Sequence, residues 1–129
     1  MAGNVVADLI RSLLDNLQES GSDLTSWEAL SMILEFPEGS FNEAHGYLYL
    51  PDGEIAPVAA DPWKVESAVK AYTDSYYAPG DTLPRKILVQ FDRASGKYNV
   101  LFEETDEDRW KVTPRNFREI REELRPALA

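Results

Sequence analysis

The chain has 129 residues, of which 43% are hydrophobic and 11% aromatic, and its formal net charge is −10. This length is typical of one domain, and the apolar content is sufficient for a core, so we expect a single globular domain over residues 1–129. The negative charge repels phosphate backbones and anionic lipid headgroups, which argues against nucleic-acid or membrane-surface binding. It attracts basic proteins, although an acidic surface also serves solubility alone.

The sequence contains no cysteine. Disulfides, thiolate zinc sites and cysteine nucleophiles are therefore excluded together. The N-terminal segment is amphipathic, and it has neither a basic region nor a cleavage signal of small residues. No stretch approaches the ~20 apolar residues of a membrane span. We accordingly expect a cytoplasmic protein with no signal peptide and no membrane-spanning segment.

Near the N-terminus, apolar residues recur at intervals of three and four positions. This spacing places them on one face of a helix, which we predict over residues 3–19, and Gly21 is suited to end it. The apolar positions are Val5, Val6, Leu9, Ile10, Leu13, Leu14 and Leu17.

The segment over residues 27–36 fits both a helix and a strand, because its apolar residues satisfy either spacing. We favour a strand, since HGYLYL follows a turn and offers an antiparallel partner. A tight turn at residues 51–53 then leads to a third short strand over residues 54–59. Pro57 has no backbone N–H to donate, which limits this strand to a sheet edge.

Asp61 and Pro62 are typical of a helix start, because Asp caps free amides and Pro tolerates the first helical position. The predicted buried stripe of this second helix comprises Trp63, Val65, Ala68, Val69 and Tyr72. Apolar residues alternate along both arms of residues 85–103, with Gly96 in the connection. This pattern predicts a β-hairpin.

Thr113 and Pro114 repeat the cap-and-proline start, and Val112 with Phe117 fits a hydrophobic staple. We expect Phe117, Ile120 and Leu124 to face the core from this last helix. The elements then follow the order α-β-β-β-α-β-β-α. The predicted fold class is α+β, an antiparallel β-sheet packed by three helices.

Residues with recognisable catalytic or ligand-binding patterns are scarce. His45 is the one histidine, it lies beside a predicted strand, and no nucleophile elbow accompanies it, so we interpret it as structural. No pair of carboxylates stands out, and no glycine-rich phosphate loop is present. We predict a protein that is not an enzyme, with no catalytic residues, no cofactor and no metal site.

The stretch FEETDEDRW, residues 102–110, contains the densest acidic run. Five of the six residues Glu103–Asp108, here called the acidic segment, are acidic. It lacks the glycine and the spacing of a calcium-binding EF-hand loop. It connects the hairpin to the last helix, so Phe102 and Trp110 should fix its ends and display the carboxylates. The candidate partner-binding residues are Glu103, Glu104, Asp106, Glu107, Asp108 and Trp110. A loop that only maintains solubility is the competing interpretation.

The stretch FDRASGKYNVLFEETDEDRWKVTPRNFREIREELRP resembles the C-terminal part of the YezG-like immunity proteins, in which a hairpin, an acidic connection, a tryptophan and a last helix follow one another. The opening helix and SWEALSMILEF are similar to the beginning of that family. The resemblance implies a cytoplasmic, non-catalytic protein that binds and neutralises a cognate toxin, often a nuclease. Nucleases hold a polyanion, so this partner should be basic. The alternative is a ligand-binding or regulatory domain of unknown partner; either protein could be a monomer or a homodimer.

Overall fold

The computed structural model describes residues 5–18, 26–106 and 108–126. These residues form an α+β fold whose six strands make one sheet in the order β1-β4-β3-β2-β5-β6, with every neighbouring pair antiparallel. The elements are α1 (Val5–Asp15), β1 (Leu17–Gln18), β2 (Ala29–Glu35), β3 (Glu43–Tyr49), β4 (Ile55–Ala60), α2 (Pro62–Asp74), β5 (Lys86–Asp92), β6 (Tyr98–Glu103) and α3 (Phe117–Glu123). The predicted fold class and element order are confirmed, and the two-residue β1 is an addition.

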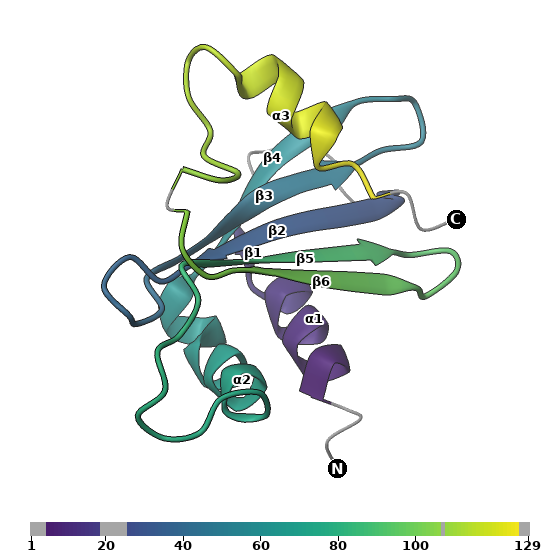
Figure 1. Ribbon diagram of the computed structural model, residues 1–129. Helices are drawn as coiled ribbons and strands as arrows, with labels where there is room; N and C mark the ends of the chain where they lie inside the picture. The colour runs from purple at the N-terminus through teal and green to yellow at the C-terminus, as the bar shows by residue number, and fades with distance from the viewer. Residues whose placement is uncertain (1–4, 19–25, 107, 127–129) are drawn as a thin grey trace.

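The helices lie on both faces of the sheet (Figure 1). The first two, α1 and α2, pack side by side against one face, and α3 covers part of the opposite face. Within the described residues, no helix combines the length and apolar composition that crossing a membrane requires.

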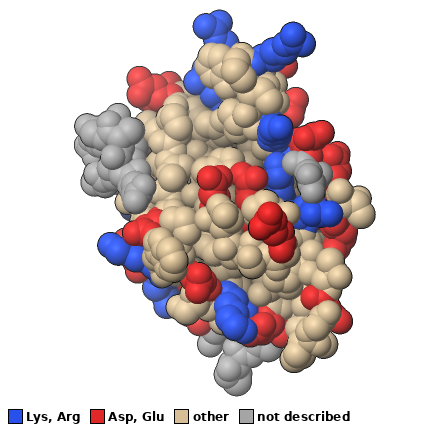
Figure 2. Space-filling model, turned by 90° about the vertical axis from the view of Figure 1, so that its left-hand side faces the viewer, with Lys and Arg blue, Asp and Glu red and all other residues tan. Residues whose placement is uncertain are grey.

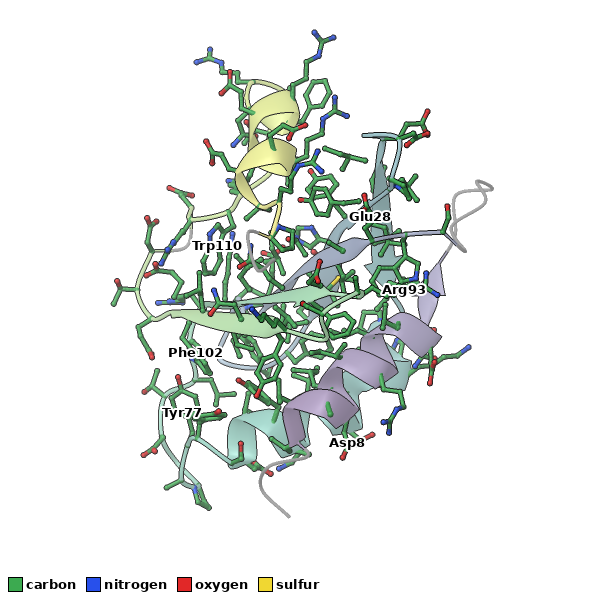
Figure 3. The ribbon with its side chains drawn as sticks, turned by 90° about the vertical axis from the view of Figure 1, so that its right-hand side faces the viewer. Asp8, Glu28, Tyr77, Arg93, Phe102 and Trp110 are labelled. Carbon is green, nitrogen blue, oxygen red and sulfur yellow. The ribbon has the colours of Figure 1, made fainter. Side chains whose placement is uncertain are left out.

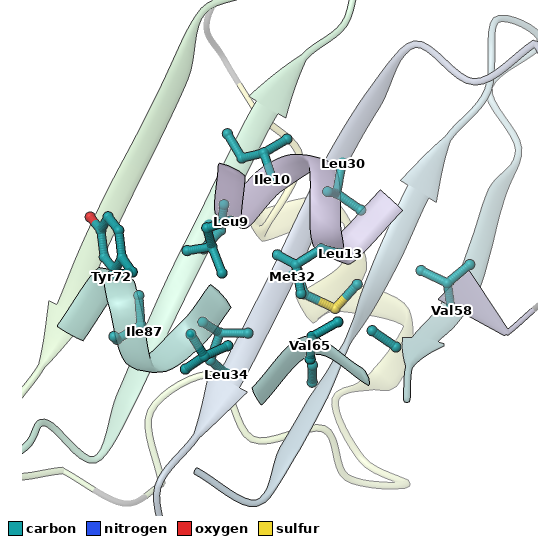
Figure 4. Packing of buried hydrophobic residues seen from close by; sticks show 14 of the residues in the cluster. Leu9, Ile10, Leu13, Leu30, Met32, Leu34, Val58, Val65, Tyr72 and Ile87 are labelled. Carbon is teal, nitrogen blue, oxygen red and sulfur yellow. The ribbon is translucent and has the colours of Figure 1, made fainter. Parts of the chain in front are cut away.

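The main core lies between the sheet and the pair α1 and α2 (Figure 4). On β2, Leu30, Met32 and Leu34 alternate toward this core and are completely buried. Successive side chains of a strand point to opposite faces, so a period of two places all three on one side. The helices contribute Leu9, Leu13, Val65 and Tyr72, among others.

A smaller core lies under α3, on the other face of the sheet. Ile120 and Leu124 pack there against strand residues including Ile33 and Leu88. The end of α3 is also held by polar contacts, because the hydroxyl of Ser31 and the amide nitrogen of Gln90 both donate to the Leu124 carbonyl. The hydroxyl of Tyr49 donates to the Arg121 carbonyl over 2.7 Å. The C-terminal end of α3 is therefore fixed to the sheet.

Residues 27–36 and 85–103 fold as predicted, into β2 and the β5–β6 hairpin. The prediction that Pro57 limits its strand to a sheet edge is wrong for the strand as a whole, because β4 lies between β1 and β3. At Pro57 itself the outer side of β4 has no strand partner in the described chain, because β1 pairs only with Ala59 and Ala60.

The first helix is shorter than predicted at its C-terminal end. It ends at Asp15, and Leu17 pairs with Ala60 in the sheet. The N–H of Asp61 donates to the Asn16 carbonyl, so sheet pairing takes the backbone that helix spacing had assigned to the helix. The predicted residues 3, 4 and 19, and Gly21, lie outside the described residues.

The prediction that Trp63 and Phe117 face the core is wrong. Trp63 is 86% exposed, and Phe117 is 44% exposed. At ~100° per helical residue, Trp63 lies roughly 200° from Val65 and cannot share the stripe of Val65, Val69 and Tyr72. Phe117 is the first residue of α3, at the end of the helix that lies away from the sheet (Figure 1), and its ring contacts Arg118 instead.

The two predicted helix starts have different outcomes. Asp61 caps α2, and its side chain accepts from the N–H of Trp63. The last helix begins at Phe117 and not at Pro114. The N–H of Thr113 donates to the Asn116 side chain, and the N–H of Asn116 donates to the Thr113 hydroxyl. These reciprocal bonds close a separate turn over residues 114–116 and delay the regular helix.

Candidate functional site

The acidic segment leaves the end of β6 and passes around the edge of the sheet. Phe102 packs with the core beneath α1 and α2, whereas Trp110 packs with the core under α3. Figure 3 shows the two rings on opposite sides of the sheet. The segment between them is therefore fixed at both ends by buried or half-buried aromatic rings.

The Phe102 end is held by an aromatic cluster. The Phe102 ring centroid lies 6.2 Å from that of Tyr72, 5.5 Å from that of Tyr76 and 6.1 Å from that of Tyr77. The hydroxyl of Tyr77 donates to Glu104 Oε1 over 3.0 Å. Burial, together with this carboxylate, raises the pKa of Tyr77 to about 12. Tyr77 is therefore a protonated donor at neutral pH and restrains Glu104.

At the other end, Trp110 adopts a left-handed backbone conformation with φ of 61°, which among the described residues is otherwise found only at glycines. The Arg109 guanidinium lies 4.3 Å from the centroid of the Trp110 ring, within the range of a cation–π contact. Left-handed conformations cost a residue with a side chain about 1–2 kcal/mol. The packing of Trp110 and the contacts of Arg109 offset this cost.

Lys86 connects the acidic segment to the sheet. It lies on β5, is only 5% exposed, and donates from Nζ to the Arg109 carbonyl over 2.8 Å. Its Nζ also lies 3.9 Å from Glu35 Oε1. A buried lysine requires such partners, because desolvation of an unpaired ammonium is costly. The backbone just before Trp110 is thus held to β5 by the charge-assisted hydrogen bond from Lys86.

Glu103 is engaged inside the segment. Its carboxylate lies 2.8 Å from Arg109 Nη1 and accepts the N–H groups of Thr105 and Asp106. The hydrogen bond from Arg109, followed by the two backbone N–H groups, lowers the pKa of Glu103 to about 2. This predicted partner-binding residue therefore acts first as an internal brace.

The remaining predicted residues have different environments. Glu104, Asp106 and Asp108 are exposed. Asp106 accepts the N–H of Asp108 over 2.9 Å, and Asp108 lies 3.9 Å from Lys111 Nζ. Glu107 lies outside the described residues. Among the described residues of the segment, Glu104, Asp106 and Asp108 thus display their carboxylates to solvent.

Figure 2 shows the side of the molecule on which the β2–β3 turn and the acidic segment lie in Figure 1. Its Asp and Glu side chains form several separate groups, with Lys and Arg side chains between them. The acidic character of this face is therefore distributed, and the acidic segment contributes one ordered part of it.

A second group of polar side chains lies on the same face of the sheet as α3. His45 Nε2 lies 2.5 Å from Glu35 Oε2, and Glu43 is the direct cross-strand neighbour of Glu35. His45 was noted in the sequence and interpreted as structural, whereas both carboxylates were missed. The sequence pattern could have indicated this group, since Glu43 and His45 are two residues apart on one strand and Glu35 ends the strand before the turn.

The interactions of the Glu103 carboxylate predict how the stability of the folded state changes at acidic pH. Because its pKa is lowered from 4.5 to about 2, the ionised carboxylate stabilises the folded state above pH 4.5, and this contribution disappears as the pH falls toward 2. Glu103→Gln should lower the melting temperature at pH 7, and the difference from the wild type should shrink below pH 4.5. Thermal unfolding across this pH range measures both effects. Glu123→Gln makes the same charge change at an exposed site; an equal response would refute the brace.

Comparison with known proteins gives no identification. No protein-family model, no curated protein and no solved structure matches this chain.

Proposed function

We propose that the protein is a non-catalytic immunity protein that binds and neutralises a basic, nuclease-type toxin through the acidic segment. The observation that carries this proposal is the anchoring of the segment on both faces of the sheet. Tyr77 restrains Glu104, and Lys86 with Arg109 holds the backbone before Trp110. The exposed carboxylates are displayed on a supported backbone, which lowers the entropy lost when a partner pairs with them.

Charge supports a basic partner. The net charge of −10 attracts cations over long range, and ordered carboxylates then select the side on which a basic surface docks. Nuclease toxins must bind a polyanion, so their active surfaces are rich in Lys and Arg. An acidic protein that covers such a surface blocks access of the nucleic acid without any chemistry of its own. The resemblance of the sequence to the YezG-like immunity proteins points to the same class of partner.

Charge reversal at the exposed positions tests the role of the segment. Glu104→Lys with Asp106→Lys should slow association with the toxin about tenfold at low salt, because electrostatic steering is lost. The difference should shrink as ionic strength rises, since salt screens the exposed charges. Stopped-flow or surface-based kinetics with the toxin encoded beside the gene measures the rate.

Asp8→Lys with Asp15→Lys provides the matched control, because it makes the same change in net charge on α1, away from the acidic segment. A smaller effect of this control supports local docking at the segment. Equal slowing by both variants would assign the effect to net charge alone and remove the segment from the interface. Absence of any complex with the neighbouring toxin would overturn the function itself.

The alternative of a homodimeric regulatory domain rests on the β6 edge. This strand pairs only with β5 in the described chain, and Tyr98 and Leu101 on it are exposed. Unpaired edge strands can pair with a second copy. Light scattering of the isolated protein distinguishes a self-associating domain from a monomeric inhibitor.

A further inference from the structure

We infer that Glu35, Glu43 and His45 form a binding site for one divalent cation of the zinc type. The three side chains offer one carboxylate oxygen each from Glu35 and Glu43 and a ring nitrogen from His45, and these atoms all lie within 4.8 Å of one another. This inference is independent of the proposed toxin binding.

The positions follow from the register of two central strands. Glu35 on β2 pairs directly with Glu43 on β3, and His45 lies two residues further along β3 on the same face. Regular strands hold ligands more accurately than loops do. The site is also accessible, because the side chains of Glu35 and His45 are 26% and 31% exposed. An ion could enter from solvent and keep a water molecule as a further ligand.

The distances fit zinc with small side-chain rotations. Zinc bonds to histidine nitrogen and carboxylate oxygen at about 2.0–2.2 Å, so tetrahedral ligands lie about 3.4 Å apart. His45 Nε2 and Glu35 Oε2 are 2.5 Å apart and would open by about 1 Å, with Glu43 moving inward. An imidazole among the ligands favours zinc or cobalt over magnesium or calcium, which prefer oxygen alone.

Lys86 would position one ligand without occupying the site. Its Nζ lies 3.9 Å from Oε1 of Glu35, whereas His45 faces Oε2. One oxygen of Glu35 is thus directed toward the lysine and the other toward the ligand cluster. Groups that orient a ligand in this way commonly tune metal affinity.

The experiment uses chelator-treated protein titrated with Zn²⁺ in a calorimeter and with Co²⁺ in a spectrophotometer. We expect one ion per chain and the visible absorption of tetrahedral Co²⁺, with no comparable binding of Mg²⁺. Because the chain has a single histidine, its imidazole NMR signals report on His45 directly and should shift on addition of Zn²⁺. No heat, or unshifted imidazole signals, would overturn the site.

Variants test the ligand set. His45→Ala and Glu43→Gln should each weaken Zn²⁺ binding at least about tenfold, because loss of a direct ligand costs no less than loss of an orienting group. Circular dichroism verifies that the variants fold. Asp8→Asn with Asp15→Asn removes two exposed acids on α1, across the sheet from the site, and should bind Zn²⁺ as the wild type does. Equal weakening by this control, or unchanged binding by His45→Ala, would show nonspecific attraction and refute the inference.

Discussion

Gly46→Ala should lower the free energy of unfolding by about 3 kcal/mol, the upper range for overpacking of a core. Gly46 lies on β3 opposite Met32 of β2. A Cβ added there would lie 1.8 Å from the Ser31 carbonyl oxygen and 2.8 Å from the Met32 Cα. Both are backbone atoms of the neighbouring central strand, so relief requires separation of β2 and β3. Urea unfolding followed by circular dichroism measures the loss.

Gly53→Ala is the informative comparison. Gly53 lies in the turn before β4 with φ of 91°, and a Cβ there would meet nothing within 4 Å. Its substitution should cost only the strain of a left-handed alanine, about 1 kcal/mol. If Gly46→Ala cost no more than Gly53→Ala, close approach of the two strands would not be the reason for glycine at position 46.

The alternation and the helical spacing of apolar residues were sufficient to predict most elements of this fold. Residues 27–36 satisfied both spacings, and the nearby HGYLYL partner decided correctly for a strand. The prediction that Trp63 is buried was wrong because its hydrophobicity was given more weight than its angular position on the helix. The prediction that Phe117 faces the core was wrong because the turn formed by Thr113 and Asn116 delays the start of the helix. Sequence spacing alone also does not reveal which end of a helix contacts the sheet.

The position of the acidic segment could also be predicted, since a hairpin precedes it and a helix follows it. The inward direction of Glu103 could not, because it depends on Arg109 folding back across a turn. The role of Lys86 depends on strand register, which pairs it with Glu35 on one side and Glu103 on the other. Such register is a property of the assembled sheet, and no local pattern around Lys86 indicates it.

The same register explains why His45 had no predicted partner. Glu35 and His45 are ten residues apart, separated by a turn whose length decides which residues face each other. A shift of one residue would send Glu35 to the opposite face. From the sequence His45 was interpreted as structural, and only the paired strands reveal the carboxylates beside it.

Lys86→Met should lower the free energy of unfolding by about 2 kcal/mol, because the Arg109 carbonyl and Glu35 lose a buried cationic partner. Methionine keeps most of the aliphatic length, so the change isolates the ammonium group. If this bond holds the acidic segment, amide hydrogen exchange at Arg109 and Lys111 should quicken more than global destabilisation explains. Unfolding in urea and exchange monitored by NMR measure the two effects.

Lys64→Met is the matched control, because Lys64 is exposed on α2 and the substitution removes the same charge. It should leave both the unfolding free energy and the exchange near Trp110 unchanged. If amide hydrogen exchange accelerates uniformly along the Lys86→Met chain, Lys86 contributes only to global stability. Acceleration confined to the acidic segment would instead establish that one buried lysine decides whether the carboxylates of Glu104, Asp106 and Asp108 are displayed in a fixed array. Toxin affinity should then fall in this variant even though none of those carboxylates has been changed.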